Sequence, residues 1–196
     1  MRLLEWIAGI VLFLQLPIPL YWFAMHPLMR FWRTRPHGAA FLAGVIVAWP
    51  PVTVCLIVFR HELFRESAPP VAFIIAGLGL IAFEAWIFWR VKRDLGGARL
   101  VGKTELSGSG EIARTGIYSR IRHPRYAGSF LAILGACLIA GTRIAWAVSI
   151  VWALLMFSAI LLEEREMRRR FGAEFTAYCR SVPRFLPFRW KTAARE

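Results

Sequence analysis

Residues 120–129 read Arg-Ile-Arg-His-Pro-Arg-Tyr-Ala-Gly-Ser, a polar segment that separates two long apolar regions. A membrane-spanning chain keeps its helices apolar and gathers its charges in the loops between them. Proline is favoured at the first position of a helix, where its missing N–H is not needed. The segment therefore predicts that a membrane helix begins at about Pro124.

The composition indicates a membrane protein. Of the 196 residues, 58% are hydrophobic, against roughly 45–50% in soluble domains. The charged residues lie in blocks between apolar runs, and the formal net charge is +13. In such a chain we assign this charge to basic loops that face anionic lipid headgroups, and we expect no nucleic-acid partner. The sequence predicts an all-α integral membrane protein with a single membrane domain, residues 1–196.

Apolar segments predict five transmembrane helices, of which the first three lie within residues 1–89. A helix needs about 20 residues to cross the hydrocarbon layer, so the fourth segment is short. The segments are 3–25, 38–59, 70–89, 126–141 and 144–162. The turn 141–143 makes the last two a helical hairpin. Prolines inside the first two helices predict kinks there; they are Pro17, Pro19, Pro50 and Pro51.

The basic residues predict the orientation in the membrane. The loops 26–37, 90–125 and 163–196 hold 21 of the 25 Lys and Arg residues. Because cytoplasmic loops carry the excess of positive charge, we expect the N-terminus outside and the C-terminus in the cytoplasm. In a bacterium this would be the inner membrane. Both polar clusters of the second half then lie on the cytoplasmic side.

The second polar cluster begins at Glu163 and Glu164, directly after the last apolar segment. Residues 163–180 predict a basic amphipathic helix that lies on the membrane surface or packs on the loop. Its apolar stripe consists of Met167, Phe171, Phe175 and Tyr178. Gly172 weakens this helix, and the Pro-aromatic tail 181–188 cannot continue it.

Both clusters have a functional and a structural interpretation. A helix that starts at Pro124 presents free N–H groups, which suit a carboxylate or phosphate and would be helped by the arginines. The arginines could equally hold lipid headgroups. Glu163 and Glu164 could bind ribose hydroxyls or a cationic ligand, or could form ion pairs with the arginines.

Two further positions are candidates inside the apolar segments. Glu84 is an intramembrane acid, which is a functional hypothesis by default, but it could also pair with Arg90 or with an arginine of the hairpin. A stripe of small residues predicts close helix packing, above all at Ala132 and Gly135; it consists of Gly128, Ala132 and Gly135/Ala136. Gly128 lies nearer the interface, where it could also let a ligand approach the backbone. The three cysteines show no paired spacing, so we expect no metal site.

Taken together, these residues resemble the isoprenylcysteine carboxyl methyltransferase family, whose plan the phospholipid N-methyltransferases share. The resemblance covers residues 90–188, about half of the chain, which would be the catalytic half. It lies in Arg122-His123-Pro124-x-Tyr126-x-Gly128, in Glu163-Glu164, and in Phe171-Gly172-x-Glu174-Phe175-x-x-Tyr178-x-x-x-Val182-Pro183-Arg184-Phe185-x-Pro187.

The resemblance implies a membrane methyltransferase that uses S-adenosylmethionine on a lipid or isoprenoid-type substrate. It implies that the cofactor is bound by His123, Pro124, Tyr126, Gly128, Glu163, Glu164, Tyr178 and Pro183. Arg184 resembles a basic catalytic position near the substrate carboxylate, and Glu84 is our second substrate-binding candidate. Glu164 could accept a proton if the acceptor is an amine. Phe175 departs from the family, where Tyr is more usual.

Two other functions remain open at this point. Membrane sterol reductases, which use NADPH, have a similar His-Pro-x-Tyr-x-Gly motif and a Tyr-Cys ending like residues 178–179. A non-enzymatic lipid-binding module would use the arginines for anionic lipid. The sequence leaves the acceptor (carboxylate, amine or thiol) and the oligomeric state open.

Overall fold

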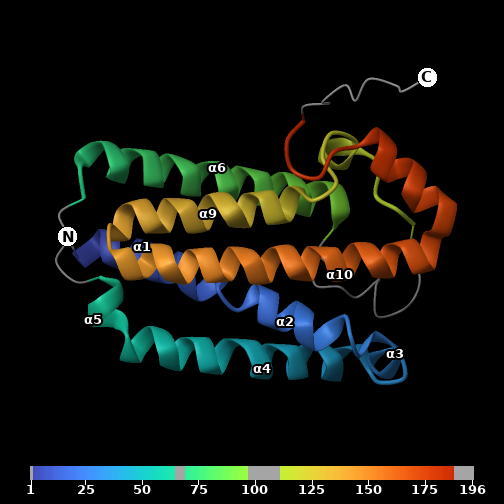
Figure 1. Ribbon diagram of the computed structural model, residues 1–196, viewed down its shortest axis with the longest axis horizontal. Coiled ribbons are helices and arrows are strands. Elements are labelled where there is room, and N and C mark those ends of the chain that lie inside the picture. Colours follow the sequence, from blue (N-terminus) through green and yellow to red (C-terminus); the bar gives the residue numbers. More distant parts are fainter. Residues whose placement is uncertain (1, 65–68, 97–110, 188–196) are drawn as a thin grey trace.

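The computed structural model describes residues 2–64, 69–96 and 111–187, and within these ranges the chain contains helices and no strands. The expected all-α fold is confirmed (Figure 1). The helices are α1 (Arg2–Gln15), α2 (Ile18–Met25), α3 (Met29–Trp32), α4 (His37–Val58), α5 (Arg60–Leu63), α6 (Val71–Leu95), the 3-10 helix η1 (Gly116–Ser119), α9 (Pro124–Ala140) and α10 (Arg143–Ser181).

Among the described residues, four helical segments are long and apolar enough to cross a membrane: Leu3–Met25, Gly38–Val58, Val71–Leu95 and Arg143–Ser181. The fifth expected span is α9, which is apolar but has only 17 residues, about 25 Å of helix. This agrees with the short fourth segment of the sequence. The chain runs along the bundle five times, so α3, η1 and the end of α10 lie at one end, while α5 lies at the other (Figure 1).

Proline separates the first span into two helices. Residues 16–17 form a turn between α1 and α2, which confirms the expected interruption at Pro17. In contrast, α4 remains helical through Pro50 and Pro51 and ends at Val58.

The last helix differs from the expectation of a separate helix over residues 163–180. Helix α10 continues without a break from Arg143 past Glu163 and Glu164, and its kink lies at Gly172, where φ is +52° and ψ is −123°. Glycine has no Cβ and adopts this backbone conformation without the steric cost that other residues meet. The helical turns beyond the kink pack their apolar side chains, Phe175 and Tyr178, against Ile112 of the preceding loop.

Helices α6 and α9 approach each other through two glycines. A Cβ added to Gly77 would lie 2.7 Å from the carbonyl oxygen of Gly135, and a Cβ added to Gly135 would lie 2.6 Å from that of Gly77. The backbones are therefore in direct contact, as small residues permit between membrane helices. This contact confirms close packing as the role of Gly135 in the small-residue stripe.

We expect Gly135→Ala to destabilise the protein by about 1–3 kcal/mol, because the methyl group forces the two helices apart. The matched control is Gly79→Ala in α6, where nothing lies within 4 Å of the added Cβ. Thermal unfolding in detergent micelles measures both variants. Equal melting temperatures for the two variants would contradict the close contact.

Candidate functional site

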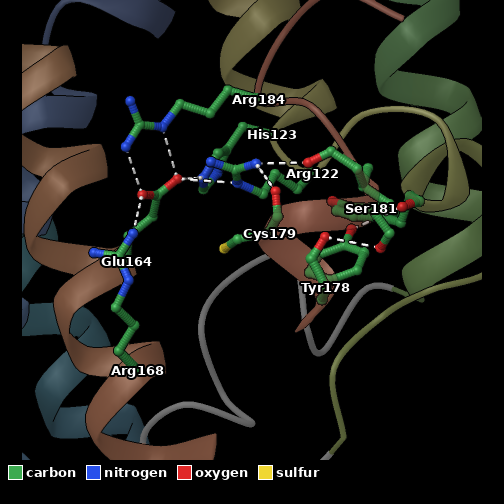
Figure 2. Close-up of polar contacts among 10 residues, drawn as sticks. Arg122, His123, Glu164, Arg168, Tyr178, Cys179, Ser181 and Arg184 are labelled. Carbon is green, nitrogen blue, oxygen red and sulfur yellow. Dashed lines mark hydrogen bonds and ion pairs between the residues drawn. The ribbon is translucent and has the colours of Figure 1, made fainter. Parts of the chain in front are cut away.

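The two sequence motifs meet at the carboxylate of Glu164, whose side chain is fully buried. A buried charge is costly unless it is paired and hydrogen-bonded, and here cations and an imidazole surround it (Figure 2). Its partners are Arg122 Nε at 3.1 Å, His123 Nε2 at 3.1 Å, Arg168 Nη2 at 3.3 Å, and Arg184 through Nε at 2.9 Å and Nη2 at 2.7 Å. A carboxylate has about four acceptor positions, so these contacts occupy it completely.

Arg122 ties the C-terminal tail to the start of α9. Its Nη1 donates to the carbonyl oxygens of Val182, at 2.6 Å, and Cys179, at 3.3 Å. It thereby satisfies carbonyls that the end of α10 leaves without intrahelical partners. The backbone N–H of Arg122 donates to Pro183 O at 2.9 Å, and that of His123 donates to Arg184 O at 3.0 Å. The tail therefore lies beside the two residues that precede α9.

Arg184 is the more exposed of the two arginines that reach Glu164 from outside α10. Its side chain is 33% exposed, whereas those of Arg122 and His123 are 10% and 6% exposed; Arg168, one turn further along α10, is 48% exposed. The hydrogen bonds to Glu164 raise the pKa of the Arg184 guanidinium above its usual value. It stays charged under all physiological conditions, so it can exchange one anionic partner for another without losing its charge.

Glu163, the residue before Glu164, links the two helices of the hairpin, α9 and α10. The hydroxyl of Tyr126, which is buried in α9, donates to Glu163 Oε2 at 2.5 Å. Glu163 itself is only half-buried. Of the two adjacent acids, Glu164 is therefore enclosed by cations, while Glu163 retains an accessible side.

Aromatic rings extend the site from His123 toward the membrane interior. The ring of Phe185 lies 6.2 Å from that of His123 and 5.8 Å from that of Phe130, measured between centroids. Phe130 in turn makes an edge contact with Trp152, at 5.2 Å. The guanidinium of Arg184 lies over the ring of Phe157, 5.8 Å from its centroid. These aromatic rings could stack on an adenine-like ring or stabilise a cation.

The structure thus brings together most of the residues expected from the sequence; these are His123, Pro124, Tyr126, Glu163, Glu164, Pro183 and Arg184. The other three expected residues, Tyr178, Gly128 and Glu84, lie at the edge of this group. The hydroxyl of Tyr178 donates to Tyr118 O at 2.7 Å. Gly128 faces α6, where an added Cβ would lie 3.3 Å from Glu84 Cγ.

Sequence reasoning left the role of Arg122 open and gave Arg168 no specific role. Arg168 follows Glu164 by four residues, a spacing that places the two on one helix face and could have identified this pair. No local signal predicts that Arg122 holds the tail, because its partners lie about 60 residues further along the chain.

Comparison with known proteins gives a family match and one curated relative. The family described as "Phospholipid methyltransferase" matches residues 72–174, just over half of the chain, from α6 to the kink of α10. The chain is also similar to the nickel-cobalt-cadmium resistance protein NccN of Alcaligenes xylosoxydans xylosoxydans, with 34% identity over 80 residues. This match covers 40% of the chain and 37% of the length of that relative. No solved structure matches.

We expect Glu164→Gln to cost about 3–5 kcal/mol of stability, because the buried guanidinium of Arg122 loses its counter-charge and the partners of Glu164 lose their common acceptor. The control is Glu174→Gln in the same helix. Glu174 is exposed and pairs with Arg114, so that variant should lose less than about 1 kcal/mol. Thermal unfolding in detergent compares the two. The interpretation fails if both variants melt at the temperature of the parent protein.

Proposed function

The chain belongs to the phospholipid methyltransferase family, and we propose that this membrane methyltransferase uses S-adenosylmethionine to methylate a lipid or lipid-modified substrate. The observation that carries the proposal is the meeting of the two motifs. Residues 122–126 and 163–164 are about 40 positions apart, yet they are joined by hydrogen bonds from Arg122 and His123 to Glu164 and from Tyr126 to Glu163. The charged, aromatic-lined site lies at the end of an apolar hairpin.

The residues present match the chemical groups of S-adenosylmethionine. The cofactor has a carboxylate, for which the N-terminus of α9 and the guanidinium of Arg184 are suitable partners. Its ribose hydroxyls can donate to the accessible side of Glu163. Its sulfonium and adenine are groups that aromatic rings such as Phe185 and Phe130 stabilise. When bound, the cofactor supplies a methyl group on a sulfonium, which is already a good leaving group.

In this proposal Glu164 acts mainly by holding its neighbours in place. Its two oxygens are occupied, so it can accept a proton from an amine only after one partner has moved away. Arg184 is the partner we expect to move, because it is one-third exposed and lies in the tail beyond the end of α10, whereas Arg168 lies within the helix. When it is released from Glu164, its guanidinium can bind a ligand carboxylate through the same two nitrogens, Nε and Nη2. Pro183 and Tyr178 then close the site from the side of the tail.

Besides binding the cofactor, the protein must align the nucleophile with the methyl group and exclude water from the reaction centre. Methyl transfer is an in-line displacement, and a correctly held nucleophile can gain many orders of magnitude in rate from positioning alone. The apolar helices α6, α9 and α10 surround the proposed reaction centre with low-dielectric material. A carboxylate acceptor, as in the isoprenylcysteine reaction, needs no base; an amine acceptor needs one.

The orientation follows from the same charges. We propose that the N-terminus lies outside, and that the site and the C-terminus lie in the cytoplasm, since α3, the start of α9 and the end of α10, which all carry arginines, lie at one end of the bundle (Figure 1). A lipid acceptor would then enter from the bilayer between the helices.

We expect purified protein to bind S-adenosylmethionine saturably in detergent, and Glu163→Gln and His123→Ala to weaken this binding about tenfold or more, the loss of one or two hydrogen bonds to charged groups. Calorimetry with unlabelled cofactor measures the affinity, and transfer of a labelled methyl group to extracted lipid measures the activity. Glu62→Gln, an exposed acid at the opposite end of the bundle, is the control.

NADPH serves as the competing ligand in the same experiment. Because a ligand raises the melting temperature of the state that binds it, thermal shifts compare the two cofactors directly. Stabilisation by NADPH alone would favour a reductase and overturn the proposal. Unchanged affinity in both site variants would show that the cofactor binds elsewhere.

A further inference from the structure

The outer face of α6 carries a row of side chains that change from small to aromatic to cationic along the helix. The outer row consists of Gly79, Ala82, Trp86, Trp89, Arg90 and Arg93. Residues three or four positions apart share one face of a helix, so the row is a single surface. It points away from α9, which α6 meets on its other side through Gly77 and Ile87.

The apolar part of the outer row is open to the bilayer. In the described part of the chain, nothing lies within 4 Å of a Cβ added to Gly79. Trp86 and Trp89 are 49% and 54% exposed. From Gly79 to Arg90 the helix rises about 16 Å, close to half of the hydrocarbon layer of about 30 Å. The row therefore matches the length of one leaflet, and its small residues leave space for an acyl chain beside the helix.

At the end of α6 that adjoins η1, two arginines lie over the two tryptophans of the row. The guanidinium of Arg90 lies 5.7 Å from the centroid of the Trp86 ring, and that of Arg93 lies 5.1 Å from the centroid of the Trp89 ring. Tryptophan and arginine are typical of the boundary between hydrocarbon and headgroups, where a long side chain follows apolar surface and its charge reaches the polar layer. This end of the row thus lies at the level of lipid phosphates.

Arg90 has a hydrogen-bond donor that the fold leaves unused. Its Nε is buried and has no hydrogen-bond partner in the described part of the chain. Asp94, the acid one turn further along α6, has other partners: its Oδ2 accepts from the backbone N–H of Ile117 at 2.9 Å, and its Oδ1 accepts from Arg93 Nε at 3.4 Å. A buried donor without an acceptor is costly, whereas a guanidinium binds phosphate oxygens strongly. An oxygen acceptor beside Arg90 would remove this cost.

We propose that the outer row of α6 is an accessory site for one anionic phospholipid. The phosphate oxygens accept hydrogen bonds from Arg90 and Arg93, and an acyl chain lies along Trp86 toward Gly79. The positive group of a zwitterionic head would lie beside two arginines, so the site favours an anionic head. The row faces away from α9 and from the proposed reaction centre, so this lipid is not the methyl acceptor. The inference does not depend on methyl transfer.

Interfacial anchoring without lipid selection is the alternative, and Arg35 provides the comparison. Its guanidinium lies 5.1 Å from the centroid of the Phe31 ring, but Arg35 is exposed and lies outside the outer row of α6. If Arg90 served only as an interfacial anchor, replacing it and replacing Arg35 would have the same effect on lipid binding. The two arginines therefore form a matched pair for the test.

Native mass spectrometry of the full chain in detergent, which counts bound lipid molecules, tests the proposal. The protein is titrated with palmitoyl-oleoyl phosphatidylglycerol and, separately, with phosphatidylcholine that carries the same chains. We expect the first phosphatidylglycerol to bind about tenfold or more tightly than phosphatidylcholine. Arg90→Gln should weaken phosphatidylglycerol about tenfold, as expected for the loss of a hydrogen bond between charged groups, and Arg35→Gln should leave its affinity unchanged.

Equal affinities for the two lipids would overturn the proposal, as would equal losses in Arg90→Gln and Arg35→Gln. Glycerol 3-phosphate, which has the phosphate without the chains, should not bind at concentrations of phosphatidylglycerol that saturate the site; binding as tight as that of the lipid would refute a lipid site. The melting temperature of each variant is compared with that of the parent. If Arg90→Gln fails to fold, Arg90→Lys keeps the charge without the Nε donor and should weaken phosphatidylglycerol several-fold; unchanged affinity would overturn the role of Arg90 Nε.

Discussion

The fold of the second half depends on the charge of one buried carboxylate, Glu164. The side chain lies at the end of an apolar helix, and it is stabilised because three arginines and a histidine converge on it. Those partners come from three places: the segment before α9, the following turn of α10, and the tail. Satisfying this single charge therefore holds the hairpin, the helix start and the C-terminal segment in one arrangement.

The kink at Gly172 makes that arrangement possible. A straight helix would carry residues 173–181 away from the bundle along the axis of α10. The positive φ of Gly172 instead turns the chain back, so that Val182 and Pro183 reach Arg122. Figure 1 shows the last part of α10 and the tail returning over the ends of α6 and α9. A single glycine conformation thus places the tail over the site.

The N-terminal helices are attached to the same end of α10 by a second ion-pair cluster. Glu166, two residues after Glu164, binds His26 Nδ1 at 2.9 Å and Arg33 Nη2 at 2.8 Å. The first half of the chain is therefore held against the second half by polar contacts at this end and by α1 packing on α9 within the bundle.

The sequence by itself determined the all-α membrane fold, the short fourth helix, its start at Pro124 and the family, because these depend on hydrophobic runs, on proline and on motif spacing, which are local properties. It also identified Glu163, Glu164, His123 and Tyr126 as candidates. Only the tertiary structure decided that α10 continues to Gly172, that Arg122 holds the tail, and that Arg122 and Arg184 meet at Glu164. The last two features depend on contacts between residues 20 to 60 positions apart, whose partners are selected by packing and by the cost of an unpaired buried charge. No local pattern encodes that selection.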